Sequence, residues 1–223
     1  MTFSESLPII SSICILVLGL FVFLKSPKSK LKTLFFFLCL IAGMWLFGTY
    51  IMFLNRGSES QAIFWDRFIY LVVVFSPVVF YHFSAVYCRF QRKLLINSGY
   101  ILSFIFLILS RTDYFIDGLY YYPWGVHTQA RLFHHFFLAY LFIYMLLVLV
   151  NFYKHYKNSE GVIKRQALYM FIAFLLFIII SETAFLPAYN IDIYYPFPYI
   201  SGVVFTAVLA YFIFIKSKLE DKF

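Results

Sequence analysis

The sequence predicts an all-α polytopic membrane protein, folded as a bundle of seven transmembrane helices. Three observations predict this fold: an extreme apolar content, seven long apolar segments, and basic residues confined to alternate connections between them. Of the 223 residues, 63% are hydrophobic and 24% are aromatic. Apolar residues make up only about half of a soluble domain, so the composition indicates an integral membrane protein.

The apolar segments set the number of crossings. A helix needs about 20 apolar residues to cross the hydrocarbon core, with roughly 17 as the lower limit. Seven segments meet this length, at about 7–24, 33–54, 68–87, 94–110, 132–152, 167–186 and 198–215. The fourth is the weakest because Asn97, Ser98 and Gly99 interrupt it. Short connections predict a single membrane domain over residues 1–223, with no soluble domain on either face.

The basic residues predict an orientation and also support the fourth span. All 11 lysines, and 14 of the 18 basic residues, lie in the connections after the first, third, fifth and seventh segments. Removing the fourth span would place the later lysines on the opposite side. Because lysine and arginine in short loops stay cytoplasmic during insertion, we expect a multi-pass protein of the inner (plasma) membrane. Its amino terminus lies outside and its carboxyl terminus in the cytoplasm.

The formal net charge of +8 does not indicate nucleic-acid binding. The excess lies in the predicted cytoplasmic connections, where each basic residue contributes about 1 kcal/mol of attraction to anionic lipid. We therefore expect the lipid bilayer, and no nucleic acid, as a partner.

Two predicted outer connections are rich in tyrosine, tryptophan and proline. Residues 111–131 have the sequence RTDYFIDGLYYYPWGVHTQAR, and residues 187–198 have PAYNIDIYYPFP. Amphipathic rings are favoured at the headgroup level, so an aromatic belt explains them. A semi-structured cap over the bundle is the alternative, because aromatic rings supply large contact area. The two interpretations are compatible.

Ionisable groups within spans are rare and default to functional candidates. Glu182 lies near the end of the sixth predicted helix, and His134 and His135 lie near the start of the fifth, at a similar depth. A pair between Glu182 and one of these histidines would offset the cost of a buried carboxylate. The alternative is a structural clamp between the two helices.

The third predicted span contains two further features. Pro77 removes a helix hydrogen bond, so a kink is expected near mid-membrane. His82 is expected to bond a neighbouring backbone group or hydroxyl.

Several enzyme classes lack their motifs. There is no H-E-x-x-H sequence, no G-x-S-x-G sequence and no glycine-rich phosphate loop. No lysine lies within a span to form a retinal Schiff base. Cys14, Cys39 and Cys88 have no paired spacing. We therefore expect no enzymatic activity, no catalytic residue, no metal and no cofactor.

Several motifs resemble a known family. They are Trp45 and Gly48 in GMWLFGTY, the run AIFWDRFIYLVVVFSPVVFYHF at 62–83, the loop ending PWGVH, and the basic turn IKRQALY. Together they resemble the seven-transmembrane N-terminal region of bacterial sensor histidine kinases.

The resemblance implies an input module that binds a small-molecule or lipid signal at the outer face or within the bundle. The seventh span would relay the change to a cytoplasmic histidine kinase or cyclase. Only KSKLEDKF follows the last span, so the expected output is a separate partner, unless the chain is a detached input domain.

The ligand-binding or switch candidates are the outer-face residues, the proline bend and the span-end ionisable groups. These are Trp65, Arg67, Pro77, Tyr122, Trp124, His134, His135 and Glu182. Two other function classes remain open: a small transporter or transport subunit, and a non-signalling membrane assembly protein.

Overall fold

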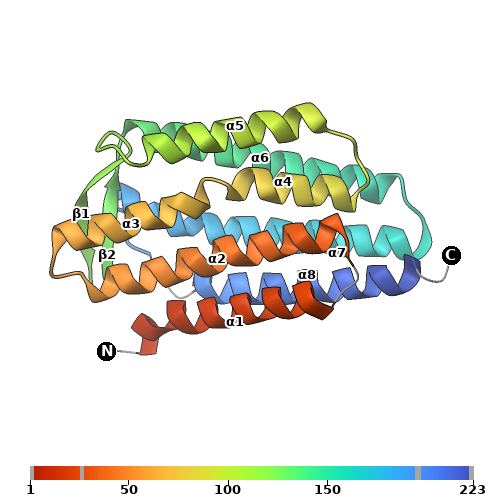
Figure 1. The fold of residues 1–223 in the computed structure, drawn as a ribbon, viewed down its shortest axis with the longest axis horizontal. Coiled ribbons are helices and arrows are strands. Elements are labelled where there is room, and N and C mark those ends of the chain that lie inside the picture. The colour runs from red at the N-terminus through yellow and green to blue at the C-terminus, as the bar shows by residue number, and fades with distance from the viewer. Residues whose placement is uncertain (1–2, 26–27, 194–196, 221–223) are drawn as a thin grey trace.

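The computed structural model describes residues 3–25, 28–193 and 197–220. In these residues it contains eight α-helices, one 3-10 helix and a two-stranded antiparallel hairpin (Figure 1). The elements are α1 (Phe3–Lys25), α2 (Lys30–Leu54), α3 (Glu59–Val73), α4 (Ser76–Tyr87), α5 (Lys93–Leu109), β1 (Ile116–Tyr122), β2 (Gly125–Ala130), α6 (Leu132–Lys157), α7 (Gly161–Ser181), η1 (Glu182–Tyr189) and α8 (Phe197–Glu220).

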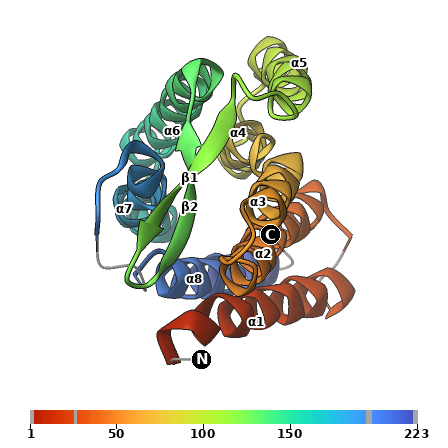
Figure 2. The same ribbon diagram turned by 90° about the vertical axis from the view of Figure 1, so that its left-hand side faces the viewer.

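The helices run alongside one another, and the two ends of the bundle differ. One end, called here the hairpin end, carries β1, β2 and η1, and α1 begins there (Figure 1). The opposite end is called here the lysine end, because the lysines gather in its connections. Helices α1, α4, α6 and α8 end there, and α2, α5 and α7 begin there. Viewed from the hairpin end, β1 and β2 lie across the mouth of the ring of helices (Figure 2).

Five helical stretches are long and apolar enough to cross a membrane. They are Ser6–Lys25, Lys30–Leu54, Glu59–Tyr87, Leu132–Lys157 and Gly161–Tyr189, and two shorter apolar helices, Lys93–Leu109 and Phe197–Ile213, complete the bundle. The predicted all-α membrane bundle is confirmed, and the chain is a multi-pass membrane protein.

The third span is broken where the kink was predicted. Helix α3 ends at Val73 and α4 begins at Ser76. Pro77 has no N–H to donate to the carbonyl of Val73, and that carbonyl instead accepts from the hydroxyl of Ser76 at 2.7 Å. The carbonyl of Val74 accepts from Ser103 of α5 at 2.9 Å. Side-chain hydroxyls thus replace helix hydrogen bonds inside the apolar core.

The polar interruption in the fourth span is a packing site. A methyl group added to Gly99 of α5 would lie 2.6 Å from Val78 and 2.7 Å from the Tyr144 ring. The hydroxyls of Tyr140 and Tyr144, both on α6, donate to the carbonyls of Gly99 and Leu95 at 3.0 and 2.7 Å. The small residue therefore lets α5 approach α4 and α6 closely, as small residues do in membrane bundles.

Two predicted span boundaries are wrong. The third span begins at Glu59, not at 68, because the helix continues through the charged residues Asp66 and Arg67. The helix of the sixth predicted span, α7, ends at Ser181, so Glu182 opens a 3-10 helix where a further α-helical turn was expected.

Candidate functional site

The connection over residues 111–131 forms a β-hairpin, so the cap interpretation is correct in substance. Its two-residue turn is Pro123–Trp124, between the paired residues Tyr122 and Gly125. The rings of Tyr122 and Trp124 stack, with centroids 4.7 Å apart and planes within 1°. Gly125 allows the turn to approach α2, because a Cβ there would lie 2.9 Å from the ring of Phe53.

Hydrogen bonds fasten the hairpin to three other parts of the molecule. The hydroxyl of Thr128 donates to the carboxylate of Asp66 on α3, and both residues are buried. The hydroxyl of Tyr122 donates to the carbonyl of Pro187 in η1 at 2.7 Å. The indole N–H of Trp124 donates to Asp192 at 2.9 Å. The hairpin is therefore latched on both sides of the bundle mouth.

Partial burial raises the pKa of Tyr122, and the nearby negative charge of Asp192 acts in the same direction. The protonated phenol is thus the form that the fold favours. Only this form donates to the carbonyl of Pro187. The hydrogen bond of Tyr122 is therefore strongest at pH values below the pKa of Tyr122.

Arginines reinforce the base of the hairpin. The guanidinium of Arg67 pairs with Asp113 and donates to the carbonyl of Ile116 at 3.3 Å. Arg111 donates to the backbone carbonyl of Arg67. The segment before β1 therefore packs along α3, although its charged atoms are largely exposed.

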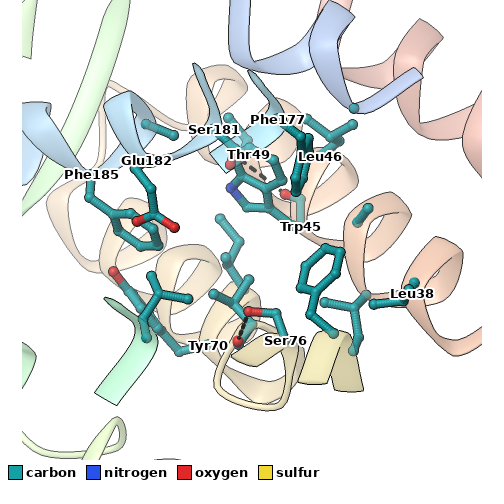
Figure 3. A pocket seen from close by; sticks show the side chains of 18 of the residues that line it. Leu38, Trp45, Leu46, Thr49, Tyr70, Ser76, Phe177, Ser181, Glu182 and Phe185 are labelled. Atoms are coloured by element: carbon teal, nitrogen blue, oxygen red, sulfur yellow. Dashed lines mark hydrogen bonds between the residues drawn. The ribbon is translucent and has the colours of Figure 1, made fainter. Parts of the chain in front are cut away.

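Beneath the hairpin lies a cavity of about 90 Å³ between the helices (Figure 3). Its walls come mainly from α2, α3 and η1, with further residues from α1, α4, β2, α6, α7 and α8. Its lining on α2 extends from Leu38 to Met52, about 20 Å along the helix axis. The cavity is accordingly long and narrow, and most of its lining is apolar.

Most polar side chains that line the cavity are bonded within the protein. The hydroxyls of Thr49 and Ser76 donate to the carbonyls of Trp45 and Val73. Asp66 accepts from Thr128, and the hydroxyl of Tyr70 lies 2.7 Å from Nε2 of His134.

Glu182 is different. Its Oε2 is buried and has no hydrogen-bond partner among the described residues, and its side chain points toward the cavity (Figure 3). Buried polar groups are normally bonded, so this oxygen is the open polar contact of the cavity.

The predicted pairing of Glu182 with a histidine is wrong. His134 is fully buried, and its Nδ1 lies 2.8 Å from the hydroxyl of Tyr189, which together with Tyr70 occupies both ring nitrogens. His135 is exposed, and its Nδ1 lies 3.0 Å from the carbonyl of Arg131. His134 instead joins α3, α6 and η1 through Tyr70 and Tyr189.

The other sequence candidates occupy different places. Trp65 packs against the rings of Phe47, Phe64 and Phe68 and does not line the cavity. Pro77 is buried just after the break in the third span. Of the eight candidates, Glu182 alone lines the cavity, while Tyr122 and Trp124 belong to the hairpin above it.

Sequence reasoning missed Asp66, His127 and Thr128. Asp66 and His127 line the cavity, and Thr128 latches the hairpin to Asp66. The sequence signal for Asp66 was its position in FWDRFIY. If the third helix is extended toward its N-terminus through this segment, the side chain of Asp66 faces the interior of the bundle. His127 and Thr128 carried no signal, because a hairpin was not expected.

A bundle of apolar helices enclosing a capped cavity defines the class: a multi-pass membrane protein with an internal cavity. Over residues 7–221 the chain matches the family described as the N-terminal 7TM region of histidine kinase, and it belongs to that family. No curated protein and no solved structure matched the chain. The resemblance seen in the motifs is thus confirmed, and the family is that of sensory membrane input modules with a kinase-related context.

Proposed function

We propose that this chain is a non-catalytic sensory input module that binds its signal in the cavity beneath the hairpin. The observation that carries the proposal is the buried, unbonded carboxylate oxygen of Glu182 at that cavity. A ligand that donates a hydrogen bond to this oxygen would satisfy it, whereas Thr49, Ser76, Asp66 and Tyr70 already have partners within the protein.

The shape of the cavity favours one chemical class. A roughly 150 Å³ apolar cavity admits benzene, and this one is smaller and extends along about four turns of α2. An unbranched apolar chain with one hydrogen-bond-donating head, a hydroxyl or an amine, fits these walls. The head would face Glu182 and the chain would lie between α2 and α7.

Aromatic packing supplies a route from the cavity to the last helix. Phe177 lines the cavity and stacks on Phe205 of α8, with centroids 4.1 Å apart and planes within 11°. Gly202, also on α8, lines the cavity. An occupant would press on these residues and bias the position of α8, provided that two packings differ by only a few kcal/mol.

The proposed orientation follows from charge. The seven spans form one membrane domain, with the hairpin end outside and the lysine end in the cytoplasm. Helix α8 would then deliver the change to a cytoplasmic histidine kinase or cyclase.

Ligand-dependent stabilisation tests the proposal. The full chain is placed in phosphatidylcholine nanodiscs and unfolded by heat with 1-propanol, propylamine or dissolved propane. We expect the alcohol or the amine to raise Tm, because a ligand at 100 times its Kd adds about 2.7 kcal/mol. Propane should raise it less.

Two variants and one control make the result specific. Glu182→Leu removes the polar contact and Gly202→Leu fills the cavity, so either should abolish the rise in Tm. Glu59→Leu changes an exposed glutamate at the same end of the bundle and should leave it intact. A rise that survives in Glu182→Leu, or no rise in the unmodified chain, would contradict the proposal.

A further inference from the structure

A second recess lies away from the cavity, toward the lysine end of the bundle. It is a groove of about 770 Å³ between the α1–α2 turn, the first turns of α2, and the facing sides of α4 and α5. It shares no lining residue with the hairpin-capped cavity, so it is separate from the site proposed to bind the signal.

The mouth of the groove is positively charged. Lys28, Lys30 and Lys32 line it, together with Ser29 and Thr33, and no acidic residue is among its described lining. Lys28 and Lys30 are exposed and form no ion pair among the described residues. The ammonium groups of Lys28 and Lys30 and the hydroxyl of Ser29 provide donors for a phosphate, whereas the hydroxyl of Thr33 already donates to the carbonyl of Ser29 at 3.2 Å.

Lys32 is held differently from its two neighbours. Its residue is only 8% exposed, and its Nζ donates to the carbonyl of Phe23 at 2.8 Å. The same ammonium lies 5.1 Å from the centre of the Phe23 ring. This fixed charge joins the last turn of α1 to the first turn of α2.

The walls below the mouth are apolar and face outward. Leu24 and Phe37 are 67% and 46% exposed, which places them against lipid chains in a membrane. Phe37 lies seven residues beyond Lys30, about 10 Å deeper along α2. At the back, Nδ1 of His82 on α4 lies 3.1 Å from the hydroxyl of Tyr100 on α5, as expected for a hydroxyl-bonded histidine.

We propose that this groove binds an anionic phospholipid, with the phosphate at Lys28 and Lys30 and an acyl chain along Phe37. Charge complementarity selects the anionic headgroup, and basic recesses between transmembrane helices are suited to such lipids. The depth of the groove places the charges at headgroup level and the aromatic wall in the hydrocarbon. In the proposed orientation, the lipid belongs to the cytoplasmic leaflet.

Native mass spectrometry of the full chain in detergent tests the site. Dioleoyl phosphatidylglycerol and dioleoyl phosphatidylcholine are compared as probes, with the double variant K28Q/K30Q. We expect retention of phosphatidylglycerol over phosphatidylcholine, and a fall in phosphatidylglycerol affinity of roughly tenfold or more in the variant.

The matched control is K154Q/K157Q, which removes two exposed lysines from the end of α6 and should leave the affinity within about twofold. Equal losses in the two double variants would mean diffuse attraction and would overturn the proposal, as would equal retention of the two lipids. Glycerol 3-phosphate should not displace the lipid. Displacement would identify a phosphate site without a lipid requirement and would also overturn it.

Discussion

The two ends of the bundle satisfy their polar groups in opposite ways. At the hairpin end, Thr128, Tyr122 and Trp124 bond to Asp66, Pro187 and Asp192 across large sequence separations. At the lysine end, Lys28 and Lys30 remain exposed beside an open groove. Internal partners make a pre-formed, closed site, whereas exposed charges leave their contacts to water or lipid. This difference supports the two proposals, recognition of the signal at the first end and lipid binding at the second.

The largest effect is expected from loss of the buried hydrogen bond between Thr128 and Asp66. Thr128→Val removes the donor to Asp66 and leaves a buried carboxylate with one partner fewer, at a cost of about 2–3 kcal/mol. Hydrogen-exchange protection of the β1 and β2 amides should fall accordingly.

Thr112→Val is the control, because the Thr112 hydroxyl bonds only the local carbonyl of Leu109. If the hairpin amides stay equally protected in both variants, the hairpin end is not latched as described.

The next effect tests whether tight packing extends to α5. Gly99→Ala would place a methyl group 2.6 Å from Val78, and overpacking of this kind costs about 1–2 kcal/mol. Thermal unfolding in detergent should show the loss.

Gly57→Ala has no atom within 4 Å of the added carbon and should change stability by less than about 0.5 kcal/mol. Equal stability of the two alanine variants would argue against close contact of α5 with α4 and α6.

A smaller effect concerns Tyr122. Tyr122→Phe removes one hydrogen bond, worth about 1 kcal/mol. Because the fold raises the pKa of Tyr122 above the ordinary value of 10.0, the stabilisation is complete below that value and is lost as pH rises through the folded pKa. The emission of Trp124, which stacks on Tyr122, should report this alkaline loss, and the phenylalanine variant should lack it.

Tyr121→Phe changes the neighbouring tyrosine, which is 67% exposed, and should keep the alkaline transition. A transition of the same size in Tyr122→Phe would assign it to another group.

The smallest effect is expected at the exposed Arg67–Asp113 ion pair, at the base of the hairpin. Asp113→Asn removes the partner of Arg67, but the side chain of Asp113 is 77% exposed. Such pairs contribute about 0–1 kcal/mol and are screened by salt. A loss above about 2 kcal/mol in thermal unfolding, or one that persists in about 1 M salt, would show that this exposed ion pair is as important as the buried Thr128–Asp66 hydrogen bond.

Sequence patterning predicted the all-α membrane bundle because hydropathy and charge act locally along the chain. It failed where a distant partner changes the environment of a residue. The third span was predicted to begin at 68, which left Asp66 outside it, but Thr128, 62 residues away, bonds Asp66 inside the bundle.

The candidate site was only partly predictable for the same reason. Glu182 could be selected as a rare ionisable residue near a span end, but its cavity is formed by helices far apart in sequence. Its expected partner, His134, is taken by Tyr70 and Tyr189. The pairing of β1 with β2 also escaped prediction, because the tyrosines of residues 120–122 suited an aromatic belt equally well.

The central claim is that the hairpin end faces outward and receives the signal. Labelling of intact cells with a membrane-impermeant maleimide tests it most directly, in a chain whose three native cysteines are replaced by alanine. The substitutions are Tyr121→Cys in the hairpin and Asn158→Cys in the α6–α7 turn, both at exposed positions. The account predicts labelling at position 121 in intact cells, and at position 158 only after permeabilisation. Labelling at position 158 in intact cells, with position 121 protected, would contradict it.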